Sequence, residues 1–188
     1  MTDVMLLWDN PLLFEKLFEE NGLKCQRILS AALGTPFLPA CKCVIVPTGF
    51  ANSAYTKILP GIERNGKAFE KFVSAGGVLV VFGALVTTYD HKWLPMQLTY
   101  TEKHGETHLH RVGEHEAQCI VADPGMAVEC DGYFSSTDGD VILNNDDGQA
   151  VMVVKKVGDG MIIATTVHEF PSPDFLGCVM DNARRSKL

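Results

Sequence analysis

Three short apolar runs limit what this chain can fold into more than any other feature. They are VMLLW, CVIVP and VLVVF, at residues 4–8, 43–47 and 78–82. Each is apolar throughout and rich in β-branched or large aliphatic residues, which predicts strands buried on both faces. Helical patterns lie between them, one opening at Asp9-Asn10-Pro11 and one in NGKAFEKFVSAGG, which ends at a glycine pair. Alternating strands and helices predict a parallel sheet covered on both faces.

The second half of the chain has a different pattern. THLHRV, AQCIVA, DVILN, AVMVVKKV and MIIATTV predict short strands separated by Gly, Asp and Asn turns. The last two strands predict an antiparallel hairpin whose second strand ends at His168, and a final helix follows in SPDFLGCVMDNARRS. We therefore predict one domain over residues 1–188 with an α/β fold. In detail, it is a three-layer α/β/α, flavodoxin-like fold with a central parallel sheet and an antiparallel C-terminal hairpin.

Charge and composition exclude several classes of partner. The formal net charge is −7, which argues against nucleic-acid binding, and no apolar run approaches the length of a membrane span. The first residues, MTDVMLLWDNP, lack the basic start of a secretory signal, and six cysteines are scattered through the chain. We expect a cytoplasmic protein with reduced thiols that binds no membrane.

The order of elements resembles the class I glutamine-amidotransferase-like superfamily. Three stretches carry the resemblance: VIVPTGFANS at 44–53, FEKFVSAGGVLVVFGALV at 69–86 and VKKVGDGMIIATTVHEFPSPDF at 154–175. The chain is most similar to the N-terminal domains of biotin–protein ligases and to the ThuA-like group. The resemblance covers most of the chain outside residues 87–116, and it is more specific for fold than for activity.

The resemblance implies a catalytic turn from which the nucleophile is absent. Hydrolytic members carry a Cys in a strained strand-to-helix turn, at the position that aligns with Gly83. Glycine has no side chain that could attack a substrate. The family's His-x-Glu pair becomes His168-Glu169, so the carboxylate is displaced by one residue and points to the opposite strand face. The resemblance thus implies a scaffold without glutaminase activity.

A ligand site is expected beyond the carboxyl ends of the parallel strands, where such sheets bind ligands. The residues that we expect to contact a ligand are Thr48, Gly49, Phe50, Gly83, Ala84, Tyr133 and His168. The loop PTGFANS at 47–53 also offers donors for an anion, although Gly49 has an equally simple explanation as a turn residue.

A histidine-rich segment, HGETHLHRVGEHE at 104–116, suggests a second kind of site. In an extended strand His108 and His110 share one face and could bind one zinc ion. Glu106, His115 and His168 are candidates for a third ligand, and a solvated hairpin is the simpler interpretation. No cofactor is otherwise expected.

Two functional hypotheses follow. The first is a non-catalytic amidotransferase-like domain that binds a small molecule or a protein through the degenerate cleft. The second is a metal-assisted hydrolase that uses segment 104–116. The absence of a nucleophile at Gly83 favours the first. The sequence names neither the ligand nor an oligomeric state, and a homo-oligomer stays open.

Overall fold

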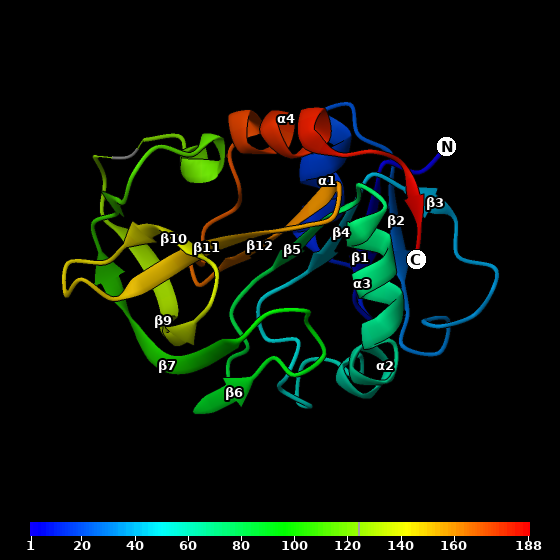
Figure 1. Ribbon diagram of the computed structural model, residues 1–188, viewed down its shortest axis with the longest axis horizontal. Coiled ribbons are helices and arrows are strands. Elements are labelled where there is room, and N and C mark those ends of the chain that lie inside the picture. The colour runs from blue at the N-terminus through cyan, green and yellow to red at the C-terminus, as the bar shows by residue number, and fades with distance from the viewer. Residues whose placement is uncertain (124) are drawn as a thin grey trace.

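The computed structural model describes residues 1–123 and 125–188, and one large sheet dominates it (Figure 1). Nine strands of this eleven-stranded sheet follow the order β2-β1-β4-β5-β12-β11-β9-β7-β6, while β10 pairs with β11 and β8 pairs with β10. The first five strands of this order are mutually parallel, and the strands beyond β12 pair antiparallel. The predicted α/β class is confirmed.

The parallel half contains all four α-helices of the described residues. Its strands are β1 (Val4–Leu7), β2 (Cys25–Ile28), β4 (Cys43–Val46), β5 (Val78–Val81) and β12 (Gly160–Thr165). Its helices are α1 (Leu13–Glu20), α2 (Leu59–Arg64), α3 (Gly66–Ser74) and α4 (Pro173–Asn182). A short pair, β3 (Ala40–Cys41) with β13 (Ser186–Lys187), joins the chain end to this half.

The three apolar runs form the middle three of the five parallel strands. Strand β4 lies between β1 and β5, parallel to both, with Val44 beside Met5 and Leu79. All four residues of each of these strands are buried, which explains why their sequences lack any polar alternation.

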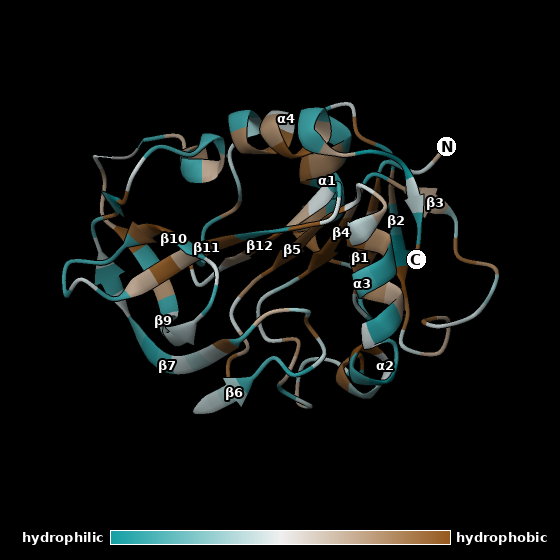
Figure 2. Ribbon diagram, in the orientation of Figure 1, coloured by the Kyte–Doolittle hydropathy of each residue, from teal (hydrophilic) through white to brown (hydrophobic). Residues whose placement is uncertain are grey.

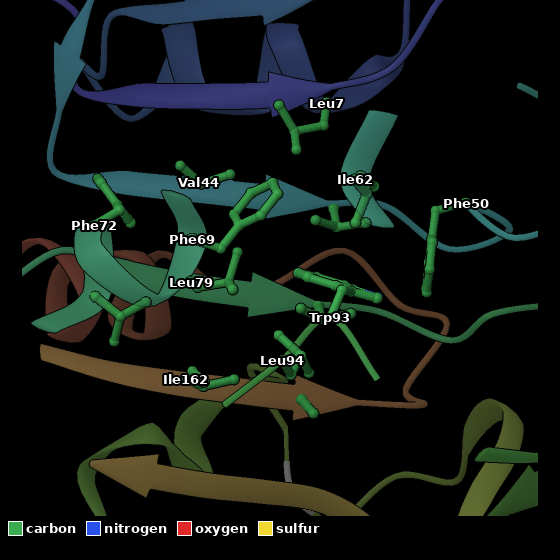
Figure 3. Packing of buried hydrophobic residues seen from close by; sticks show 14 of the residues in the cluster. Leu7, Val44, Phe50, Ile62, Phe69, Phe72, Leu79, Trp93, Leu94 and Ile162 are labelled. Atoms are coloured by element: carbon green, nitrogen blue, oxygen red, sulfur yellow. The ribbon is translucent and has the colours of Figure 1, made fainter. Parts of the chain in front are cut away.

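Helices cover both faces of the parallel strands. On one face, Phe69 and Phe72 of α3 pack with Val44 and Leu79 in a continuous apolar cluster (Figure 3). On the other face, Phe18 of α1 and residues of α4 join the alternate strand positions. Figure 2 shows the strands of this half as mainly brown, apolar ribbons between mixed helices. Burial on both faces is the stabilising arrangement for a parallel sheet.

The antiparallel half combines three long strands, β7, β9 and β11, with shorter ones, and several of its strands are partly exposed. Its elements are β6 (Thr88–Asp90), β7 (Leu98–Thr107), β8 (His110–Arg111), β9 (Val128–Thr137), β10 (Asp140–Asn144) and β11 (Ala150–Val157). Strands β11 and β12 form the predicted antiparallel hairpin. Register shifts interrupt the pairing of β7 with β9, once between Glu102 and Gly105.

Three sequence expectations about local structure are wrong. THLHRV is not one strand, because β7 ends at Thr107 and β8 begins only at His110. AQCIVA is not a strand: Glu116–Cys119 form a 3₁₀-helix, and Ala117 and Ile120, spaced by three, are both buried. The Gln118 side chain donates to the backbone oxygens of Val112, Gly113 and Ile142, which holds this turn in place. No helix follows β5, because the described chain runs from Gly83 through a loop into β6.

Among the described residues, no helix is both long and apolar enough to cross a membrane. All six cysteines are free thiols.

Candidate functional site

A cleft of about 570 Å³ lies at the carboxyl ends of β1, β4, β5 and β12. Trp8 follows β1, Pro47 and Thr48 follow β4, Phe82 follows β5, and His168 follows β12, so four parallel strands contribute to its wall. Its volume falls in the range typical of small-molecule sites. The sheet topology therefore places the cleft at the edge where ligands were expected.

Aromatic side chains dominate the wall of the cleft. The five aromatic lining residues are Trp8, Phe14, Tyr55, Phe82 and Phe170. The edge of the Phe14 ring meets both Phe82 and Phe170, with ring centroids 5.6 and 5.0 Å apart. The polar groups are few: the side chains of Thr48, His168 and Glu169, with the Tyr55 hydroxyl and the Trp8 N–H. This combination of an apolar wall with few polar groups is characteristic of small-molecule pockets.

His168 is oriented by a carboxylate that comes from the other half of the sheet. Nδ1 of His168 lies 2.6 Å from Oδ1 of Asp131, which is in strand β9. An ionised carboxylate only accepts hydrogen bonds, so Nδ1 carries the proton of this contact. Nε2 is then the ring nitrogen outside this contact, with an acceptor lone pair when the ring is neutral.

Backbone and side-chain contacts fix Asp131 at the seam between the two halves. Its N–H donates to the oxygen of Thr166, just beyond β12, at 2.8 Å. The Tyr100 hydroxyl donates to the Asp131 carbonyl at 2.9 Å, and the Thr166 hydroxyl donates to the Gly132 carbonyl at 2.7 Å. These contacts tie β9 to the strand end that carries His168, so the pair is preorganised.

Burial makes the Asp131 carboxylate unusual. Its side chain is 1% exposed, and its second oxygen, Oδ2, has no hydrogen-bond partner among the described residues. Burial raises the pKa of Asp131 above its ordinary value, while the neighbouring His168 imidazole acts in the opposite direction. Burying a carboxylate in this way costs folding free energy, and groups that are kept at such a cost are often found at functional sites.

A second imidazole lies close to the same carboxylate. Nδ1 of His104, in β7, lies 4.0 Å from Oδ1 of Asp131, beyond hydrogen-bonding distance. The His104 and His168 rings are nearly perpendicular, with centroids 6.4 Å apart. His104 therefore belongs to the surroundings of the pair rather than to the proposed histidine-rich metal site.

Gly83 has a steric role instead of the conformational one expected from the family turn. Its φ is not in the left-handed region, so glycine relieves no strain here. A Cβ at this position would lie 2.8 Å from Asp131 Oδ2, so the missing side chain makes room for the carboxylate. The left-handed residue is Leu85, with φ 51°, and its side chain lines the cleft. Neither residue offers a nucleophile.

The other residues expected to bind a ligand divide into two groups. Thr48, His168 and Glu169 line the cleft. The carboxylate bonded to the His168 ring is that of Asp131, and not that of Glu169, the residue closest in sequence to the family's glutamate. Phe50 and Ala84 are fully buried in the core, and Tyr133 packs against the apolar cluster beneath α4. The structure thus does not bring these last three residues to the cleft wall.

Two donor residues of the loop at 47–53, Gly49 and Asn52, are already bonded within the protein. The N–H of Gly49 donates to the Gly83 oxygen at 2.8 Å, and that of Asn52 donates to the Gly49 oxygen at 3.0 Å. The Asn52 amide donates to the Leu85 oxygen at 3.2 Å. Gly49 has φ 86°, so it is a turn residue, and these donors stabilise the loop itself.

His108 and His110 converge, but on a carboxylate. His108 Nδ1 lies 3.3 Å from Asp146 Oδ2, and His110 Nε2 lies 2.8 Å from Asp146 Oδ1. Among residues 1–123 and 125–188 no cluster of three or more His, Cys, Asp or Glu side chains is arranged to hold a metal. The third ligands considered from the sequence, Glu106, His115 and His168, are not gathered with them.

Asp131 is the residue of the candidate site that the sequence did not reveal. It lies 37 positions before His168, and only the pairing of β9 with the sheet brings the two together. The one signal was the segment Asp131-Gly132-Tyr133, where Asp131 lies between the buried residues Cys130 and Gly132 of strand β9. A buried carboxylate needs a partner, and His168 is that partner.

Comparisons with known proteins find similar folds but no relative by sequence. No family model matches the chain, and no curated protein matches its sequence. A cytoplasmic protein from Salmonella typhimurium LT2 has a TM-score of 0.60 at 12% identity, covering 98% of this chain and 100% of its own. A glutamine amidotransferase from Thermotoga maritima has a TM-score of 0.57 at 11% identity, over 89% of this chain and 75% of its own.

Larger enzymes contain a similar unit. A β-galactosidase from the Antarctic haloarchaeon Halorubrum lacusprofundi has a TM-score of 0.59 at 15% identity, covering 97% of this chain. The match covers only 30% of that enzyme's length. At these identities the likeness concerns the fold alone. The chain therefore has a fold similar to that of a glutamine amidotransferase.

Proposed function

We propose that this chain is a member of the class I glutamine-amidotransferase-like superfamily that binds a small molecule in its cleft and has no glutaminase activity. The observation that carries the proposal is the His168–Asp131 pair at a cleft whose strand turn has no nucleophile. The parallel strands, numbered among themselves, lie in the order 2-1-3-4-5, which supports the flavodoxin-like detail. The Salmonella protein described as cytoplasmic supports a cytoplasmic location.

The thiols of the chain do not replace the missing nucleophile. None of the six cysteines is among the residues that line the cleft. Burial raises the pKa of Cys25, Cys41 and Cys130 to about 12, so these thiols stay protonated at neutral pH. A protonated, buried thiol does not attack an amide.

The cleft retains the parts that bind a ligand. His168, held by Asp131, offers one oriented nitrogen, and Thr48 offers a hydroxyl beside the aromatic wall. Such a site can bind and orient a molecule that is mostly apolar and has one or two polar groups. A protein partner that inserts an aromatic or aliphatic side chain is the other occupant of this kind.

The experiment is a small-molecule screen by thermal shift, together with an assay for ammonia release from glutamine. We expect no ammonia release, and at least one compound class that stabilises the wild type but not His168→Asn. His110→Asn is the matched control, because His110 is also a half-exposed histidine bonded to an aspartate. Thiol-sensitive ammonia release, or hits that His168→Asn leaves unchanged, would contradict the proposal.

A metal-assisted hydrolase is the second candidate, favoured by the convergence of His108 and His110. These imidazoles and Asp146 would have to exchange their mutual hydrogen bonds for a metal ion. Metal analysis of untagged protein, after dialysis with equimolar Zn²⁺, tests this candidate directly. Stoichiometric zinc that His108→Gln and His110→Gln remove would favour the hydrolase over the binding domain.

A further inference from the structure

The cleft has a charge character that selects among small molecules. Glu169 is the only carboxylate among the described lining residues, and none of them is Lys or Arg. Behind the wall, Asp131 adds a second, buried carboxyl group within reach of His168. The whole chain has a net charge of −7, so the long-range field also attracts cations.

The aromatic wall has the composition that binds organic cations. Trp8, Phe14, Tyr55, Phe82 and Phe170 all line this one cleft. The negative face of an aromatic ring attracts an ammonium group, and Trp does so most strongly. Tyr55 and Phe170 are about half exposed, with 53% and 48% of their surface accessible, so a ligand can reach their rings without any rearrangement.

Some of the features that would bind an anion are already occupied. Helix α1 begins beside the cleft, and its N-terminus would favour negative charge. However, the carboxylate of Glu15 in its first turn accepts from the Leu12 N–H at 3.0 Å. The Gly49 N–H is bonded to Gly83, and the Lys57 ammonium donates to the Ser53 carbonyl at 2.7 Å. The cleft wall also has no Lys or Arg among its described residues, so it lacks a cationic side chain to pair with a phosphate or carboxylate.

We infer that the ligand of this cleft is a small organic amine, bound as its ammonium ion with an aromatic or aliphatic body. The body lies against the aromatic wall, and the ammonium group lies near Glu169 and donates a hydrogen bond to His168 Nε2. This inference rests on the proposed function, because it assigns a ligand class to the same cleft. A sugar fits less well, because Thr48, His168 and Glu169 are few partners for many hydroxyls.

The test compares three probes of similar size and different charge. They are 2-phenylethylammonium, neutral 2-phenylethanol and anionic 3-phenylpropionate, each titrated by calorimetry and by chemical-shift mapping of the full chain. We expect the ammonium probe to bind about tenfold more tightly than the alcohol, and the anion to bind least. Glu169→Gln should abolish most of this preference. Glu19→Gln, an exposed glutamate on α1 away from the cleft wall, should leave it unchanged.

The outcomes separate this inference from the proposed function. Three results would overturn the assignment of an amine ligand. They are equal binding of the three probes, tighter binding of the anion or the alcohol, and a preference that Glu169→Gln leaves intact. Shifts at His168 and Thr48 with any of these probes would still support a ligand-binding cleft. Absence of binding by all three would also overturn the amine, while the wider screen with His168→Asn would decide the proposed function.

Discussion

Two aspartates of this molecule each lie beside two histidines, in opposite settings. Asp131 is 1% exposed, bonded to His168 and near His104, at the seam of the two halves of the sheet. Asp146 is half exposed and bonded to His108 and His110 in the antiparallel half. Burial raises the pKa of Asp131, whereas hydrogen bonds from the His108 N–H and the histidine rings lower the pKa of Asp146.

We interpret Asp131 as part of the candidate functional site and Asp146 as a residue that stabilises the fold. Asp146 also accepts from the Thr107 hydroxyl at 3.1 Å, so it joins the end of β7 to the turn between β10 and β11. Every contact of Asp146 favours its ionised form and stabilises the fold. Asp131 keeps one oxygen unpartnered among the described residues and stays buried beside a cleft. That arrangement orients His168 at the expense of stability.

The largest effect is expected from filling the space beside Asp131. Gly83→Ala should lower the free energy of unfolding by about 1–3 kcal/mol, because its Cβ would lie 2.8 Å from Asp131 Oδ2. Gly105→Ala in β7 is the control, because a Cβ added there would have no neighbouring atom within 4 Å among the described residues. Its effect should stay within about 0.5 kcal/mol in urea unfolding. Equal stabilities of the two variants would mean that Asp131 does not pack against Gly83.

The pH dependence of stability should differ in sign between the two aspartates. A raised folded-state pKa means that Asp131 favours folding most when protonated, below its ordinary value of 3.8, and loses that contribution as pH rises through the folded pKa. Asp131→Asn should therefore be at least as stable as the wild type at neutral pH. The two proteins should become alike below pH 3.8, if His168 keeps its bond to the amide.

Asp146 should behave in the opposite way. Its folded-state pKa is lowered, so its contribution is present above its ordinary value of 3.8 and is lost as pH falls through the folded pKa. Asp146→Asn should be less stable than the wild type at neutral pH, and the difference should shrink in acid. Thermal unfolding of both variants between neutral pH and about pH 3 measures both slopes. Parallel slopes would remove the distinction between the two sites.

Salt should produce the smallest effect and sharpen the same comparison. Asp146 and its histidines are exposed, so raising the ionic strength to about 1 M, where the Debye length is about 3 Å, should reduce the destabilisation by Asp146→Asn. The effect of Asp131→Asn should change less, because buried pairs are screened less. Urea unfolding at low and high salt checks this. Equal salt dependence would indicate that Asp131 is accessible to ions.

The sequence predicted the parallel half well because strands that are buried on both faces are apolar at every position. The apolar runs of β1, β4 and β5 have no other plausible partner than helices on both faces, and the structure places them side by side. It predicted the antiparallel half less well, because half-exposed segments allow more than one period. Ala117 and Ile120 are spaced by three, which places both on one face of a 3₁₀-turn, and the Gln118 contacts hold that turn.

The candidate site was predictable only where it depends on strand ends. His168 and Thr48 follow parallel strands, so the topology rule places them at the cleft. The role of Asp131 depends on how β9 pairs with β7 and on its link to Thr166, which no local pattern encodes. The left-handed backbone at Leu85 was likewise hidden, because the sequence suggested that the glycine two positions earlier held the strained conformation.

The central claim is that Asp131 orients His168 toward the cleft, and the tautomer of the His168 ring tests it most directly. Long-range ¹H–¹⁵N NMR of ¹⁵N-histidine-labelled protein, at a pH where the ring is neutral, distinguishes a proton on Nδ1 from one on Nε2. The 2.6 Å contact between Nδ1 and Asp131 Oδ1 predicts the proton on Nδ1 in the wild type and a shift toward the Nε2 tautomer in Asp131→Ala. A wild-type ring protonated on Nε2, or a tautomer that Asp131→Ala leaves unchanged, would contradict the account.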